Sequence, residues 1–185
     1  AIVCGNIGNP LVEVDDSRLD YIVAEVSSYQ LEAIATFRPW ISLILNLQPD
    51  HLERHHSMDE YARQKARIFM NQTGDDYLIY NQDDPLVVEM VKPARAKLIG
   101  FRKSDTQIIT LDSKEIRIPG RHNLENSLAA AQAAVLCGIP ADTIAAVLRE
   151  FPGVEHRIEF VTTLKGIEFR NDSKGTNPDS TLVAI

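Results

Sequence analysis

The sequence lacks any long apolar run: its longest covers about eight residues, far short of the roughly 20 that a membrane-spanning helix needs, and no basic-then-apolar leader is present. It holds only two cysteines, Cys4 and Cys137. Their separation matches no zinc or redox motif, so we expect both to be reduced and buried. Basic residues are outnumbered, 19 against 26 acidic ones, and the net charge of -7 argues against nucleic acid or an anionic membrane as a partner. We therefore expect a cytoplasmic protein.

The composition and length of the sequence are those of an ordinary globular protein. Apolar residues make up 44% of the 185, enough for one sizeable core and part of a second domain. The sequence begins at Ala1 inside an apolar run and stops at Ile185 within an expected helix, so we expect it to be a fragment.

Short apolar runs alternate with helical patterns along most of the chain. Strands are predicted at residues 1–4, 20–26, 40–47, 76–81 and 97–101, and helices between them include 58–69 and 83–91. This alternation predicts an α/β fold, a doubly wound, mostly parallel sheet with helices on both faces.

The second half of the chain continues with other elements. We expect a β-hairpin from residues 107–111 and 115–118, an Ala-rich helix ending at Cys137, another helix from Pro140, and strands at 160–163 and 167–170. Phe151-Pro152-Gly153 predicts a boundary, with one domain at residues 1–153 and the beginning of a second α/β domain at 154–185.

Polar residues stand at the carboxyl ends of two predicted strands. The loop from Asn46 to Ser57 contains Asp50, His51, Glu53, Arg54, His55 and His56, at the carboxyl end of a strand where open α/β sheets bind ligands. The alternative is a solvated loop in which Asp50 or Ser57 caps the next helix. Glu25 interrupts the apolar run of the strand at 20–26, and a buried carboxylate there needs a cation or a hydrogen-bond donor. Its alternative is a capped helix with a Glu at its start.

The motif N-L-Q-P-D-H-L-E-R-H at Asn46 to His55, followed by Tyr61 and Lys65, resembles the central-domain signature of the Mur ligases. These ATP-dependent enzymes add amino acids to the peptidoglycan precursor. Gln48 and Glu53 differ from the residues that are usual at these positions of the signature. The resemblance implies that His51 binds magnesium and that Lys65 is carbamylated, which makes it a further oxygen donor, and that both are catalytic. From the helix pattern alone, Lys65 could equally be a surface lysine paired with Asp59 or Glu60.

Further blocks extend the resemblance over almost the whole chain. E-V-S-S-Y-Q-L-E implies Glu25 as a metal ligand and Ser27 and Gln30 as contacts to the UDP-muramoyl substrate. G-N-I-G adds Asn6 to that substrate site. N-D-S-K-G-T-N adds Lys174, also as a catalytic residue, and Thr176. The last two motifs are worded as in the family members that add D-glutamate.

The nucleotide site is implied by three more segments. H-N-L-E-N resembles the family segment that contacts adenine and ribose, which implies Asn123 and Asn126, although a capping role would explain one of them. Arg157 matches the hinge arginine of the family, or is an ordinary surface strand residue. Asp172 completes the expected ATP site.

The phosphate-binding motif G-x-x-x-x-G-K-[ST] is absent, so we expect it upstream of Ala1 and expect this piece to be inactive alone. The resemblance implies a monomeric ligase that uses ATP and Mg²⁺ to join D-glutamate to a UDP-muramoyl substrate through an acyl phosphate. A folylpolyglutamate synthase-like ligase and a non-catalytic nucleotide-binding module are the alternatives.

Overall fold

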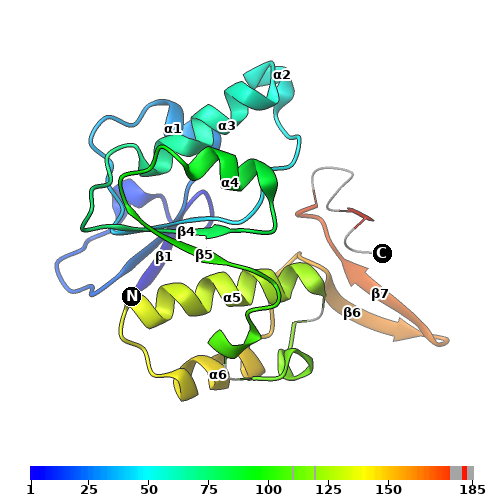
Figure 1. The fold of residues 1–185 in the computed structure, drawn as a ribbon. Helices are drawn as coiled ribbons and strands as arrows, with labels where there is room; N and C mark the ends of the chain where they lie inside the picture. The colour runs from blue at the N-terminus through cyan, green and yellow to red at the C-terminus, as the bar shows by residue number, and fades with distance from the viewer. Residues whose placement is uncertain (110, 119, 176–180, 183–185) are drawn as a thin grey trace.

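The computed structural model describes residues 1–109, 111–118, 120–175 and 181–182 (Figure 1). Two parallel ladders occupy the middle of the molecule. In the first, β1 (Ile2–Gly5) pairs with β2 (Ile22–Glu25), and in the second the order is β3 (Ile41–Ile44), β4 (Tyr77–Asn81), β5 (Lys97–Phe101). Helices α1 (Ser28–Glu32), α3 (Met58–Ala66) and α4 (Pro85–Val91) lie on one side, and α5 (Arg121–Leu136) and α6 (Ala141–Glu150) on the other. The predicted α/β fold is confirmed.

The core is split between the two faces of the three-stranded ladder. Leu78 and Ile79 are neighbours on β4, so their side chains point to opposite faces, and both are fully buried. Leu78 packs with Tyr61, Phe69 and Val87 on the side of α3 and α4. Ile79 packs in the cluster that includes α5 and α6 residues. Both faces of β4 are therefore covered, as in doubly wound folds.

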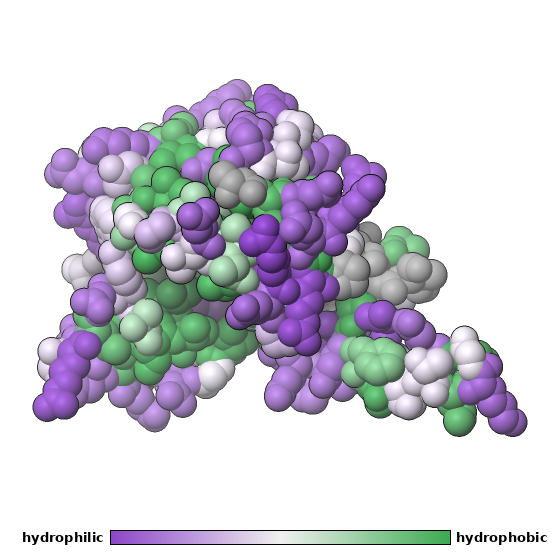
Figure 2. Space-filling model, turned by 90° about the horizontal axis from the view of Figure 1, so that it is seen from below, coloured by the Kyte–Doolittle hydropathy of each residue, from purple (hydrophilic) through white to green (hydrophobic). Residues whose placement is uncertain are grey.

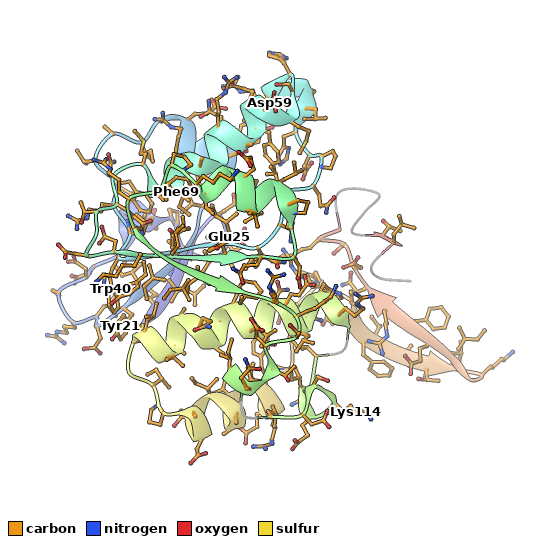
Figure 3. The ribbon with its side chains drawn as sticks, in the orientation of Figure 1. Tyr21, Glu25, Trp40, Asp59, Phe69 and Lys114 are labelled. Carbon is orange, nitrogen blue, oxygen red and sulfur yellow. The ribbon has the colours of Figure 1, made fainter. Side chains whose placement is uncertain are left out.

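The ladder of β1 and β2 is more open than its sequence predicts. Val3 is 57% exposed and Val23 is 56% exposed, and Glu25 is exposed as well. In the described part of the chain, β2 and β3 belong to separate ladders, and the rings of Tyr21 and Trp40 stack near their starts with centroids 6.5 Å apart (Figure 3). The expectation of a buried strand at 20–26 with a buried Glu25 is therefore wrong, because strand burial depends on neighbours that the local pattern does not encode.

The expected hairpin at residues 107–118 is wrong for the residues that the structure describes. They form two 3₁₀ turns, η3 (Thr106–Ile108) and η4 (Ser113–Glu115), the second closed by a capping box in which Asp112 and Glu115 exchange hydrogen bonds. The apolar residues that suggested strands, Ile109, Leu111 and Ile116, are buried in the cluster on the α5 side instead. Their alternation therefore reflects packing and not strand pairing.

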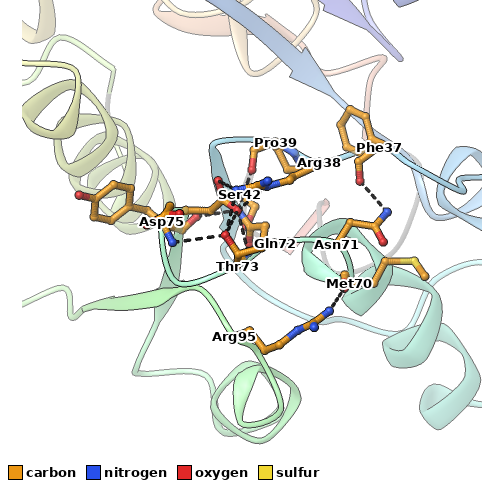
Figure 4. A network of polar contacts seen from close by, with 12 residues as sticks. Phe37, Arg38, Pro39, Ser42, Met70, Asn71, Gln72, Thr73, Asp75 and Arg95 are labelled. Carbon is orange, nitrogen blue, oxygen red and sulfur yellow. Dashed lines mark hydrogen bonds and ion pairs between the residues drawn. The ribbon is translucent and has the colours of Figure 1, made fainter.

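A buried polar network ties the start of β3 to the turn before β4 (Figure 4). Arg38 donates to both carboxylate oxygens of Asp76, at 2.7 and 3.2 Å, and Thr73 N donates to the same carboxylate at 2.7 Å. Gln72, fully buried, accepts from Ser42 and donates to two backbone carbonyls. These bonds satisfy polar groups that would otherwise be costly to bury.

After α6 the chain forms an antiparallel pair, β6 (Glu159–Leu164) and β7 (Ile167–Asn171), close to the predicted strands. The pair projects from the body of the molecule and carries both polar and apolar surface (Figures 1 and 2). Cys4 is buried as expected, while Cys137 is only partly buried. In the described ranges, no helix is both long and apolar enough to cross a membrane.

Candidate active site

Asn6 and Glu25 meet at the carboxyl ends of β1 and β2. Gly5 pairs with Glu25 in the parallel register, so the residue after each strand emerges at the same edge. Asn6 Nδ2 donates to Glu25 Oε1 at 2.9 Å, and Asn6 N donates to the Glu25 carbonyl at 2.8 Å. Gly5 has φ 103°, and a Cβ on it would lie 2.3 Å from the Glu25 carbonyl oxygen. The sequence G-N in this turn therefore allows the close approach that joins Asn6 to Glu25.

Ser27 and Gln30 begin α1 as a capping box. Gln30 N donates to Ser27 Oγ at 3.3 Å, and Ser27 N donates to Gln30 Oε1 at 2.9 Å. The capped helix start that the sequence left open is thus formed, and both predicted substrate residues take part in it. The next residue, Ser28, is buried and its hydroxyl lies 2.9 Å from His55 Nε2.

The loop between β3 and α3 has an unusual backbone. His51 has φ 54° and His56 has φ 62°, and the single turn α2 (Leu52–His55) lies between them. Left-handed conformations of residues other than glycine cost on the order of 1–3 kcal/mol each and occur often at functional sites. Ser57 accepts a hydrogen bond from Glu60 N and so caps α3, one of the two roles considered for this loop.

Lys65 lies on α3, half-buried, with Nζ 5.0 Å from the centre of the Tyr61 ring. Burial lowers the pKa of Lys65, while the charges of Asp50 and Glu25 act in the opposite direction. Glu60, the expected partner of a surface lysine, is bound by Arg63 and Gln64 instead. Lys65 is thus half-buried, and the charge that acts on it includes that of Glu25, a residue that the resemblance assigns to the same site.

Asp50 and Tyr29 belong to this neighbourhood but were not among the predicted site residues. Asp50 Oδ1 accepts from His51 N at 3.0 Å, and its charge also acts on Tyr61. Burial, Asp50 and Tyr29 together raise the pKa of Tyr61 to about 12. The Tyr29 ring lies 5.0 Å from that of His51. Their position beside the D-H and S-S motifs was the only signal in the sequence.

The donor chemistry around Lys65 fits a hard cation. Glu25 and Asp50 offer carboxylate oxygens, the ligands that Mg²⁺ prefers, and His51 adds one imidazole. The nearest carboxylates of His51 are those of Asp50, at 3.7 Å, and Glu53, at 3.8 Å. Among the described residues, no three His, Cys, Asp or Glu side chains are close enough to form a complete metal-binding group. A complete cation site at this position would need a further oxygen donor.

A second group of predicted residues interacts electrostatically with His122, near the start of α5. The charges of Arg157 and Asp172 both act on His122, whose pKa is lowered mainly by burial. Asp172 Oδ1 accepts from Ile158 N at 3.1 Å, and His156 and Ile158, on either side of Arg157, have φ 67° and 47°. Positive φ is rare for a β-branched residue, so this backbone is constrained around Arg157. His122 was not among the predicted site residues, although it is the first residue of the H-N-L-E-N motif.

Three of the remaining predicted residues lie in the described part of the chain, on α5 and after β7. Asn123 is half-buried and Asn126 is exposed, one helical turn apart on α5. Neither caps the helix, because the N-cap is Gly120. Lys174 is exposed and its backbone N donates to the carbonyl of His156 at 3.1 Å. Thr176 lies outside the described residues.

A comparison with family models decides the identity of this arrangement. The model described as Mur ligase middle domain matches residues 7–134, more than half of the chain and the part that holds Glu25, His51 and Lys65. The chain belongs to the Mur ligase family. The resemblance predicted from the sequence motifs is confirmed.

Individual relatives make the membership more specific. The UDP-N-acetylmuramoylalanine--D-glutamate ligase of Caldanaerobacter subterraneus subsp. tengcongensis is 46% identical to this Mur ligase chain, over 99% of the chain and 44% of its own length. The ligase of the same name from Clostridioides difficile is 44% identical over 99% of the chain and 45% of its own length. The chain thus spans less than half the length of the curated relatives it matches.

Solved structures show the same fold at low identity. MurF from Acinetobacter baumannii superposes with a TM-score of 0.75 at 17% identity, covering 98% of this Mur ligase chain and 47% of that protein. The MurF ligase from Thermotoga maritima, solved in complex with ADP, gives a TM-score of 0.73 at 16% identity, covering 98% and 49%. The arrangement of strands and helices is therefore that of Mur ligases.

Proposed function

We propose that this chain is the central part of an ATP-dependent ligase that joins D-glutamate to UDP-N-acetylmuramoyl-L-alanine in peptidoglycan precursor synthesis. The observation that carries the proposal is the hydrogen-bonded pair of Asn6 and Glu25 at the carboxyl ends of two parallel strands, where the charge of Glu25 also acts on Lys65. This edge is where open α/β sheets bind their ligands. Relatives that share 44–46% of the sequence over 99% of the chain carry the name of that ligase.

The reaction has two steps in this proposal. ATP transfers its γ-phosphoryl group to the alanyl carboxylate of the substrate, and the amine of D-glutamate then attacks the acyl phosphate and displaces phosphate. Both steps concentrate negative charge, so positioning and cations supply most of the catalysis. Mg²⁺, when bound, would supply positive charge at the phosphoryl oxygens.

Each residue group has a task in these steps. Glu25 and His51 would hold the metal, with Asn6 fixing one oxygen of the Glu25 carboxylate. Asn6, Ser27, Gln30, Lys174 and Thr176 would bind the UDP-muramoyl substrate, with Lys174 close to the transferred group. The charge on Lys174 suits that role because it is exposed, three residues after the end of β7.

Lys65 would act after carbamylation. The ammonium first loses a proton to water, and the neutral amine attacks carbon dioxide. A C–N bond forms as one C=O π bond of carbon dioxide opens, and the nitrogen loses a second proton, so a cation becomes a carboxylate-like oxygen donor. Burial favours the neutral amine that this reaction requires, since it lowers the pKa of the lysine. The Nζ atom of Lys65 lies over the ring of Tyr61, and the ring keeps water away from that side of the amine.

The nucleotide site would lie near the start of α5. Asn123 and Asn126 would contact adenine and ribose, and Arg157 and Asp172 the phosphates and their cation. The electrostatic proximity of Arg157 and Asp172 to His122 supports one shared site. The ADP bound by the Thermotoga maritima relative of the same fold supports a nucleotide as ligand. Residues 1–153 would form the ATP-binding domain and 154–185 the start of the next.

The test is an assay of the intact protein that contains this chain. We expect phosphate release that requires ATP, UDP-N-acetylmuramoyl-L-alanine and D-glutamate together. L-Glutamate in place of D-glutamate is the matched control. Turnover with a folate and L-glutamate would instead indicate a folylpolyglutamate synthase-like enzyme, and nucleotide binding without turnover would indicate a binding module. We expect the intact protein to act as a monomer, which light scattering checks.

A further inference from the structure

His55 is a buried histidine to which the proposed reaction assigns no task. It is 2% exposed, and its Nε2 lies 2.9 Å from the hydroxyl of Ser28, which is 3% exposed. The rings of Tyr61 and Tyr29 lie 5.3 and 5.6 Å from its own. A hydrogen bond between two fully buried side chains fixes both in one geometry, because breaking it leaves polar groups without water.

The bond joins the segment after β2 to the segment after β3. Ser28 lies three residues after Glu25, as the first residue of α1, and His55 lies four residues after His51, as the last residue of α2. His55 N also donates to the His51 carbonyl at 3.0 Å. This hydrogen bond closes the turn α2 and restrains the backbone at His51.

The loop that carries His51 has a buried anchor on each side of His51, besides the partly exposed ion pair of Arg54 with Glu32. Leu47 and His55 are its buried residues, and those between them are half-buried or exposed. At the first anchor, Leu47 N donates to Asp84 Oδ2 at 2.9 Å. At the second anchor, the buried bond is that of His55 to Ser28. His51, with its left-handed backbone, stands midway between the two anchors, so the second anchor constrains it from the α2 side.

The charge next to His55 favours one tautomer. Glu32 Oε1 lies 3.8 Å from His55 Nδ1, and Arg54 Nη2 holds the other carboxylate oxygen at 2.7 Å. Hydrogen-bonding to Arg54 lowers the pKa of Glu32, so the carboxylate stays charged. A carboxylate favours the proton on Nδ1, which leaves Nε2 to accept from the Ser28 hydroxyl.

We propose that Ser28 and His55 are positioning residues whose hydrogen bond sets the separation between Glu25 and His51, and thereby the geometry of the metal site. The assignment of Glu25 and His51 to a metal rests on the proposed function. The Ser28–His55 bond acts through the backbone on both sides, and neither of the two residues touches the metal or the substrate.

The test compares four variants of the intact protein: Ser28→Ala, His55→Phe, the double variant, and His56→Asn as control. Phenylalanine keeps a ring in the buried site but cannot accept a hydrogen bond. His56 is the next residue, exposed and with φ 62°, a conformation that asparagine tolerates. Manganese(II) serves as the metal probe, and its free concentration is measured by electron paramagnetic resonance.

We expect Ser28→Ala and His55→Phe each to weaken manganese binding by about tenfold or more, the range found for residues that orient metal ligands. In turnover, kcat should fall while KM for the UDP substrate changes little, and the double variant should lose no more than the worse single one. ¹⁵N NMR of the imidazoles, without metal, should show Nδ1–H on His55 and a shifted His51 signal in Ser28→Ala.

The proposal is overturned if folded Ser28→Ala binds manganese as tightly as His56→Asn and leaves the His51 signal unchanged. Ser28→Ala removes a single hydroxyl, so it decides the outcome alone if His55→Phe does not fold. A wild-type protein that neither turns over nor binds manganese would contradict the proposed function itself. An active wild type with unaffected variants contradicts only the positioning role.

Discussion

The side-chain amide of Asn6 donates to the Glu25 carboxylate at 2.9 Å, while the backbone N–H of Asn6 donates to the Glu25 carbonyl at 2.8 Å. Two bonds between the same pair fix the direction in which the carboxylate points. Glu25 Oε1 is the oxygen that accepts from Asn6, and the charge of Glu25 also acts on Lys65. The substrate site and the metal site of the proposed enzyme therefore share one residue pair.

Gly5→Ala should disturb this pair. The new Cβ would lie 2.3 Å from the Glu25 carbonyl oxygen, and φ 103° is strained for alanine. We expect a loss of more than about 1 kcal/mol in the free energy of unfolding, measured by urea denaturation, together with reduced activity. Gly74→Ala is the control, because nothing lies within 4 Å of its added Cβ. Equal urea midpoints for the two variants would show that Gly5 is not required.

Lys65→Ala should remove most ligase activity from the intact protein, by at least about 100-fold, the scale seen when a group that stabilises transition-state charge is lost. Formate or acetate should restore part of it, because a small carboxylate can occupy the place of the carbamate. Lys92→Ala, at an exposed lysine after α4, is the control. Full activity of Lys65→Ala without added carboxylate would rule out the proposed role.

Arg157→Ala should raise KM for ATP by about tenfold or more and leave KM for the UDP substrate almost unchanged, since a charge-assisted contact to phosphate is worth about 1.5–3 kcal/mol. Initial-rate kinetics with each substrate varied in turn measures both constants. Lys114→Ala removes a positive charge from an exposed turn and serves as control. A change in KM for the UDP substrate alone would place Arg157 in the other site.

Asp76 predicts a pH dependence of stability. Hydrogen-bonding to Arg38 and to Thr73 lowers the pKa of this carboxyl in the folded state. Its contribution is therefore present above the unfolded pKa of about 4 and is lost as the pH falls through the lower, folded value.

In Asp76→Asn that pH-dependent contribution should be missing. We expect the variant to be less stable than the wild type by about 1–3 kcal/mol near pH 7, with the difference shrinking below about pH 4. Urea denaturation at several pH values measures it. Asp75→Asn changes the neighbouring exposed carboxylate and should show no such trend. A difference that stays constant with pH would contradict the assignment.

The sequence predicted the order of the elements well because they are specified locally. The helix that carries Lys65 and the strand before its loop follow from apolar spacing, and the capping residues Ser27 and Ser57 stand where hydroxyl side chains cap helices. The meeting of Asn6 and Glu25 also follows once two parallel strands are placed in register.

What the sequence could not give depends on contacts between distant segments. The apolar run at β2 suggested burial, yet exposure is decided by whatever lies beside and over a strand. Ile109 and Ile116 alternate with polar residues as in a strand, but a capping box closes a turn between them. The partnership of Ser28 with His55 spans 27 positions and leaves no periodic trace.

The central position of β4 has a consequence for how the protein opens. Within the described ranges, β4 is the strand with a partner along each edge and helices over each face, whereas β1 and β2 pair only with one another. Amide hydrogen exchange should therefore be slowest in β4 and much faster at Asn6 and Glu25. The residues of the proposed chemistry would then fluctuate locally while the protein around them stays folded.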